Sequence, residues 1–277
     1  MADIPDFTPA PMPPPIPVTE GFVDAQGAKL WYWDTGGDGA PVVLGHSSTG
    51  SGLVWGYQQP VLAAAGYRVI GYSRRGHYGS ESGPLRDRGT GAGDLKTLAD
   101  QLELDRFHLL GTAMGGIVAT DFAQAWPERL RSLLLACTLV GVTDSDYEAM
   151  SKGLRPDGFD RLPPEFRELG PSYRAANPEG VRGWLDLEHK ALHGAPVSRQ
   201  PTATKITWRT LENLPMPVLM LTGDADLYTP PAVLGMLAER IPRQETVIIP
   251  GAGHSAYWEQ PAAFNGAMLG FLSRVEN

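Results

Sequence analysis

The chain has 277 residues, of which 42% are hydrophobic and 19% charged, and its formal net charge is −8. This composition is ordinary for a globular protein with a sizeable core. The acidic balance argues against a nucleic-acid partner, which usually meets a basic surface. No apolar run reaches the ~20 residues of a membrane span, and the single cysteine, Cys137, excludes an intrachain disulfide. We therefore expect a cytoplasmic protein that binds neither nucleic acid nor membrane.

Residues 1–20 are predicted to form an extended arm rather than a folded element. Seven of the first 17 residues are proline, and the basic and apolar runs of a signal peptide are absent. Such an arm packs either on the body of its own chain or on a neighbouring subunit. A homo-oligomer is therefore one arrangement that the sequence allows.

Beyond the arm, apolar segments with the character of strands and helices alternate. A hairpin is expected around Gln26-Gly27, followed by strands at 42–44, 67–72, 107–110 and 130–139 and by helices at 55–65, 92–104 and 113–126. The alternation resumes with strands at 218–222 and 246–249 and helices at 232–241 and 261–274. This order predicts an α/β fold, with a mostly parallel, doubly wound sheet and helices on both of its faces.

The stretch 142–213 interrupts this alternation. It is polar and rich in proline and arginine, with a helical segment at 181–193. We interpret it as an inserted helical cap, so that residues 21–141 and 214–277 together form the core. Active sites of such sheets lie at the carboxyl ends of the strands, and the chemistry is expected there.

The segment Gly111-Thr112-Ala113-Met114-Gly115 follows a predicted strand and opens a predicted helix. This is the context of the G-x-S-x-G nucleophile elbow, a sharp turn that needs small residues beside it. Alanine takes the place of the serine. A dinucleotide-binding G-x-G-x-x-G does not fit the glycine spacing, and no acidic residue ends the next strand. A plain strand-to-helix turn is the other interpretation.

With this motif the chain resembles the α/β-hydrolase superfamily in its capped, single-domain form, similar to microbial esterases, lactonases and carbon–carbon bond hydrolases. The cap matches only in position and length. The resemblance implies Ala113 as the nucleophile position, Asp226 in GDAD as the triad acid and His254 in GAGH as the general base. These residues follow one another in the family's order of nucleophile, acid and base. Asp224 is the alternative acid.

A third stretch, LGHSSTG at 44–50, matches the family's His-Gly-x loop. The resemblance implies that the backbone amides of Ser48 and Met114 stabilise an oxyanion. Ser47 stands where glycine is usual, so the identity of the donating amide stays open. His46 and Ser47 are candidates for contact with the substrate. The loop SRRGHYGSES at 73–82 is a looser match to an Arg-Gly-rich loop of the family and is interpreted as structural.

Other residues carry weaker signals. Trp184 and Tyr257 are candidate apolar walls of a substrate pocket, with core packing as the equal alternative. His189 and His193 have a helical spacing that can hold a metal, but no third ligand is evident. The chain has no P-loop, H-E-x-x-H or zinc-type cysteine set, so we expect no cofactor and no metal. Cap arginines could receive a substrate carboxylate, although such side chains are more often solvated: Arg155, Arg161, Arg167, Arg174 and Arg182.

These residues together predict a serine-type hydrolase that cleaves a carboxylic ester or lactone of a small organic molecule. In this chain the serine would be replaced by Ala113, and the enzyme would be inactive. Carbon–carbon bond hydrolysis would use the same triad. A cofactor-free oxygenase or lyase would use His254 as a base, whereas a non-catalytic binding protein would leave the Asp226–His254 pair without a purpose.

Overall fold

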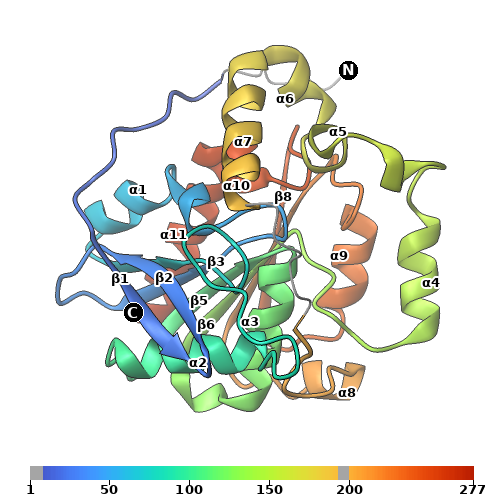
Figure 1. Ribbon diagram of the computed structural model, residues 1–277. Coiled ribbons are helices and arrows are strands. Elements are labelled where there is room, and N and C mark those ends of the chain that lie inside the picture. The colour runs from blue at the N-terminus through green and yellow to red at the C-terminus, as the bar shows by residue number, and fades with distance from the viewer. Residues whose placement is uncertain (1–8, 193–199) are drawn as a thin grey trace.

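The computed structural model describes residues 9–192 and 200–277 (Figure 1). The first eight residues of the expected arm and residues 193–199 of the expected cap, with His193, lie outside the described residues. The predicted limits of arm, core and cap stay predictions. Within the described part of the chain, no helix has the length and apolar character needed to cross a membrane.

The centre of the molecule is an eight-stranded mixed sheet in the order β1-β2-β4-β3-β5-β6-β7-β8. β1 and β2 pair with each other in antiparallel fashion and β2 pairs antiparallel with β4, whereas all pairs from β4 to β8 are parallel. The predicted α/β fold with a mostly parallel sheet is therefore confirmed. The strands are β1 (Thr19–Ala25), β2 (Ala28–Asp34), β3 (Pro41–Gly45), β4 (Arg68–Tyr72), β5 (Phe107–Thr112), β6 (Leu130–Ala136), β7 (Val218–Gly223) and β8 (Gln244–Ile249).

Helices cover both faces of this sheet (Figure 1). Because successive side chains of a strand point to opposite faces, Leu109 packs in a cluster with residues of α2, α3 and α9, and Leu110 packs in a second cluster with residues of α1 and α11. The core helices are α1 (Gln59–Ala64), α2 (Gly91–Gln101), α3 (Met114–Ala125), α9 (Pro231–Ala238), α10 (Ala256–Glu259) and α11 (Pro261–Glu276), with the 3-10 turns η1 (Gly52–Trp55) and η2 (Pro127–Arg129).

Three elements differ from the sequence prediction at their ends. The helix expected over 55–65 is split into η1 and α1, because Pro60 fits the first turn of a helix but not its interior. The third core helix begins one residue late, since Ala113 has a positive φ of 50°. The strand expected to reach residue 139 ends at Ala136, because Cys137 has a φ of 48° that no strand residue adopts.

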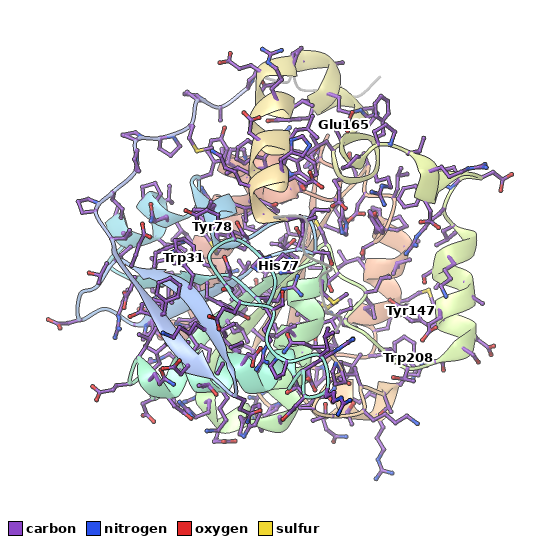
Figure 2. The ribbon with its side chains drawn as sticks, viewed as in Figure 1. Trp31, His77, Tyr78, Tyr147, Glu165 and Trp208 are labelled. Carbon is purple, nitrogen blue, oxygen red and sulfur yellow. The ribbon has the colours of Figure 1, made fainter. Side chains whose placement is uncertain are left out.

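A helical insertion joins β6 to β7, as predicted. Figure 1 shows α5, α6 and α7 at one end of the sheet and α4 beside α9. Tyr147 of α4 meets Trp208 of α8 edge to face, with 5.1 Å between the ring centroids (Figure 2). The insertion contains α4 (Ser145–Gly153), η3 (Phe159–Arg161), α5 (Pro164–Glu168), α6 (Pro171–Ala176), α7 (Pro178–Ala191) and α8 (Trp208–Leu211).

The described part of the proline-rich arm packs on the body of its own chain. The carbonyl of Ala10 accepts a hydrogen bond of 2.8 Å from the hydroxyl of Tyr57. This contact corresponds to one of the two arrangements that the sequence allows for the arm.

The loop after β4 is tied to α2 by a buried ion pair. Arg75 donates from Nε and Nη2 to both carboxylate oxygens of Asp94 at 2.8 and 2.7 Å, and the side chains are 0% and 5% exposed. The same guanidinium donates to the carbonyl of Ala25. The expected structural role of this loop fits these contacts, since removal of one partner leaves a buried charge without compensation.

We expect the Asp94→Asn variant to lose about 3 kcal/mol or more of unfolding free energy, because Arg75 then stays buried as an unpaired cation. Urea denaturation measures this loss. The matched control is Glu212→Gln, which weakens the exposed pair with Arg240 and should cost about 1 kcal/mol or less. Equal losses in the two variants would contradict the structural role of the buried pair.

Candidate active site

The turn between β5 and α3 brings residue 113 to the carboxyl end of the sheet. Ala113 has φ 50° and ψ −114°, a conformation that side chains other than glycine rarely adopt. A Cβ added at Gly111 would lie 2.3 Å from the carbonyl oxygen of Gly115, and one added at Gly115 would lie 2.3 Å from that of Gly45. The glycines of the motif are therefore required by the close approach of α3 to β3 and β5.

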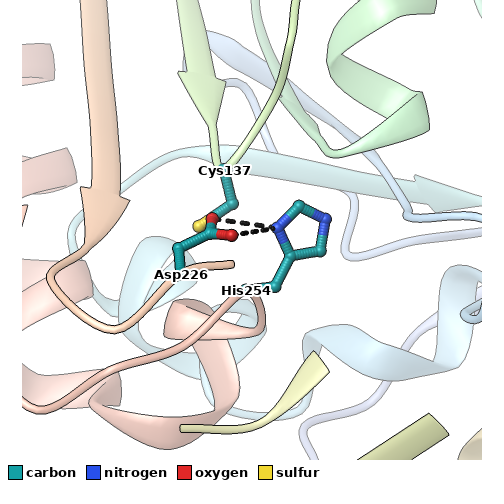
Figure 3. A group of neighbouring side chains, drawn as sticks. All are labelled: Cys137, Asp226 and His254. Atoms are coloured by element: carbon teal, nitrogen blue, oxygen red, sulfur yellow. Dashed lines mark hydrogen bonds and ion pairs between the residues drawn. The ribbon is translucent and has the colours of Figure 1, made fainter. Parts of the chain in front are cut away.

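His254 and Asp226 form a buried hydrogen-bonded pair (Figure 3). Nδ1 of His254 lies 2.9 and 3.0 Å from the two carboxylate oxygens of Asp226. Because a carboxylate can only accept, Nδ1 carries the proton, and the neutral ring keeps Nε2 as its basic nitrogen. Asp224, the alternative acid, instead accepts a bond from the amide of Gly251.

The electrostatics of this pair suit a general base. Burial by itself lowers the pKa of His254, but the charge and hydrogen bond of Asp226 outweigh burial and raise it. Burial alone would raise the pKa of Asp226, whereas His254 and the amides of Tyr228 and Thr229 lower it. Asp226 therefore stays ionised at neutral pH and stabilises the protonated imidazole.

Cys137 lies beside the pair, as Figure 3 shows. Its thiol and the ligand atoms of Asp226 and His254 lie within 4.8 Å of one another, a grouping that could approach a metal ion. However, burial raises the pKa of the thiol, so it holds its proton. Both carboxylate oxygens of Asp226 already lie within hydrogen-bond distance of Nδ1 of His254. These contacts describe a base and its carboxylate better than a metal centre.

A cavity of about 190 Å³, the catalytic cavity, opens in front of the pair. It brings together five of the residues predicted for the site: Ala113, His254, Met114, Ser48 and Ser47. Met114 begins α3, and Ser48 lies in the loop after β3. Its remaining wall is formed by Ile117, Cys137, Leu139, Glu168, Tyr228 and Thr229. The cavity thus brings His254, Ser48, Met114 and a partly apolar wall around residue 113.

Three predicted substrate contacts lie elsewhere among the described residues. His46 is 0% exposed, and its Nε2 accepts from the amide of Arg74. Trp184 is buried and donates from Nε1 to the hydroxyl of Ser255, while Tyr257 packs against Trp55 at 5.1 Å. None of the three lines the catalytic cavity. Core packing, the alternative given for the two aromatic residues, accounts for both positions.

Glu168 was not expected at the site. It ends α5 of the insertion, is 6% exposed and faces the catalytic cavity. Burial raises the pKa of its carboxyl, and the hydroxyl of Tyr228 lies 3.4 Å from it. Its carbonyl also accepts a bond from the amide of Ser255, next to the base. No local pattern in the segment FRELG distinguishes it from a solvated glutamate.

Comparison with known proteins identifies the family of the chain. Residues 42–267 match the alpha/beta hydrolase family. The chain belongs to this family. It is 28% identical to 3-oxoadipate enol-lactonase 2 of Acinetobacter baylyi over 256 residues, which cover 90% of this chain and 95% of the lactonase. The α/β hydrolase fold accounts for the elbow and for the place of His254 after β8.

Two solved structures of the family resemble the chain over most of its length. A thermophilic esterase from Thermogutta terrifontis is 26% identical, with a TM-score of 0.76, and the match covers 94% of this chain and all of the esterase. A bromoperoxidase from Bacillus anthracis is also 26% identical, with a TM-score of 0.75 over 92% of this chain and all of the peroxidase. Family members with this fold thus differ in their named activity, so the reaction must be argued from the site.

We expect Asp226→Asn to lower the pKa of His254, because the charge that raises it is lost while burial, which lowers it, remains. Titration of the imidazole protons by NMR measures the shift. Asp224→Asn is the matched control and should leave the pKa unchanged, since Asp224 bonds to the amide of Gly251 instead. A shift of similar size in both variants would contradict the assignment of Asp226 as the partner.

Proposed function

We propose that the site is that of a serine-type hydrolase for a carboxylic ester or lactone of a small organic molecule, with alanine in place of the nucleophile. The observation that carries the proposal is the hydrogen-bonded Asp226–His254 pair beside the strained turn at Ala113. The enol-lactonase and the esterase among its relatives favour a substrate of the ester or lactone type.

With a serine at position 113, each of the proposed site residues would have a role in hydrolysis. Nε2 of His254 would take the serine proton as Oγ attacks the substrate carbonyl, and Asp226 would stabilise the imidazolium. The backbone amides of Met114 and Ser48 are the proposed donors to the oxyanion. An acyl-enzyme would form, and a water molecule activated by the same histidine would release the acid.

The chain as it stands lacks this route. The methyl group of Ala113 has no atom that can attack a carbonyl or carry an acyl group. By analogy with removal of a triad serine, the loss in turnover is roughly 10⁶-fold relative to the serine form. Substrate binding does not depend on the missing oxygen, so the cavity keeps its ability to hold an ester.

A second function is favoured by the same pair. His254 has a raised pKa, is oriented by Asp226 and faces a cavity without a nucleophile. Such a base can take a proton from an acidic carbon of a bound substrate, as a cofactor-free oxygenase or lyase requires. Exchange of substrate protons with deuterated solvent, or consumption of O₂, would distinguish this chemistry from hydrolysis. A carbon–carbon bond hydrolase would again need the serine.

We expect Ala113→Ser to raise the hydrolysis of aryl esters or lactones by several orders of magnitude, because it restores the attacking oxygen beside an intact base. Release of 4-nitrophenol from acetate to octanoate esters, together with a panel of γ- and δ-lactones, measures the gain. Ala113→Gly is the control, since it relaxes the backbone without supplying a nucleophile. A serine variant as inactive as the glycine variant would overturn the hydrolase proposal and favour a binding or base-only function.

A further inference from the structure

A second cavity, which we name the side cavity, adjoins the catalytic cavity. Its volume is about 340 Å³, and Ser48, Met114 and Ile117 line both cavities. Ser48 and Met114 are the proposed oxyanion donors. A molecule whose carbonyl lies between these two amides can therefore extend one of its substituents into the side cavity. The walls of the side cavity also include Arg74 and Asp121.

Among the described residues, no carboxylate forms an ion pair with the guanidinium of Arg74. Its Nη2 donates to the carbonyl of Ser47 at 3.0 Å, while its buried Nε has no hydrogen-bond partner among the described residues. Within the same part of the chain, no carboxylate lies within the 4.0 Å of an ion pair with it. Burial lowers the pKa of the guanidinium to about 10, so the group still carries its charge at neutral pH.

The acidic residues of the neighbourhood are already occupied. Asp94 is held by both nitrogens of the Arg75 fork. Asp121, in the wall of the side cavity, accepts bonds from the amides of Ala203 and Thr204 and from the Thr204 hydroxyl at 2.7 to 2.8 Å. Neither carboxylate forms an ion pair with Arg74, so its charge has no carboxylate partner within the described part of the chain.

The other titratable groups around Arg74 are neutral at physiological pH. His46 and His77 lie next to it, and their rings are 4.7 Å apart. Burial, followed by the charge of Arg74, lowers the pKa of both histidines, and that of His77 falls to about 4. The raised pKa of Tyr72, caused mainly by burial, keeps that hydroxyl protonated. None of these three groups therefore supplies a counter-charge to Arg74.

We propose that the side cavity is an anion subsite, in which Arg74 binds a carboxylate carried by the substrate. Arg74 is half-buried, lines the side cavity and has no carboxylate partner among the described residues. A carboxylate that enters the cavity can therefore form charge-assisted hydrogen bonds with the accessible part of its guanidinium. Resting on the proposed function, this inference narrows the substrate to a small ester or lactone that carries an acid group. In this proposal the substrate carboxylate binds to Arg74 of the core and not to the arginines of the cap.

Binding to the unaltered chain tests this inference without any turnover. The probes are straight-chain carboxylates from acetate to octanoate and the methyl ester of each acid, which has nearly the same shape but no charge. Isothermal titration calorimetry, with saturation-transfer NMR for weak binders, gives the affinities at low and high salt. We expect at least one acid to bind about tenfold tighter than its ester at low salt, the size of one charge-assisted hydrogen bond.

Arg74→Gln should weaken binding of the acid about tenfold and leave that of its ester little changed. The matched control is Arg86→Gln, which removes the same charge from an exposed side chain in the same connection between β4 and α2. Arg74→Lys keeps the positive charge but loses the paired N–H donors of the guanidinium. This variant should therefore retain part of the preference for the acid over its ester.

Three results would overturn the anion subsite. The first is that the acids bind no tighter than their esters to the unaltered chain, a comparison that needs no variant to fold. Alternatively, Arg86→Gln lowers the affinity as much as Arg74→Gln does, or the preference disappears with Arg155→Gln on the cap instead. Because these measurements do not use catalysis, an inactive Ala113→Ser variant would count against the hydrolase proposal alone.

Discussion

The close approach of α3 to the sheet is the constraint on which the site depends. Gly111 and Gly115 leave no room for a Cβ at the contact, so the backbone between β5 and α3 must turn sharply. This turn forces Ala113 into a positive φ, a strain of about 1–3 kcal/mol that the surrounding sheet offsets. Cys137 and Val140, just after β6, also have positive φ values. Several residues with a strained backbone therefore lie at the edge of the sheet where the catalytic cavity is found.

Much of this arrangement could be predicted because its signals are local. Strand and helix alternation depends on neighbouring residues, and the hairpin follows from Gln26-Gly27, where both residues adopt positive φ. The elbow and the Asp226–His254 pair were predicted from short motifs and from the family's order along the chain. The distance between Asp226 and His254 could not be predicted in this way, because it depends on the parallel pairing of β7 with β6 and β8.

The remaining features depend on contacts between distant segments and on burial. Glu168 faces the cavity because the insertion folds back so that its carbonyl meets the amide of Ser255. Trp184 looks like a pocket wall in the sequence but is buried against the same loop. The unmatched charge of Arg74 appears only after Asp94 and Asp121 are seen with other partners. A pattern of residue types in the sequence cannot show which buried polar groups have hydrogen-bond or ion-pair partners in the fold.

The buried carboxyl of Glu259 connects the insertion to the base. It accepts bonds from the amides of Gly170, Gly253 and Ser255, and burial raises its pKa to about 7. Gly170 follows α5, whereas the other two amides flank His254. One side chain therefore ties the insertion to the loop that carries His254, so the position of the insertion and that of the imidazole depend on the same carboxyl group.

The geometry around residue 113 does not depend on the side chain that it carries. Ala113 is held through its backbone: its amide donates to the carbonyl of Ala136, and its own carbonyl accepts from Thr138 and Gly116. His254 is oriented by Asp226, and Met114 takes its place from the start of α3. With alanine at position 113, the turn, the cavity and the hydrogen-bonded Asp226–His254 pair are therefore all formed.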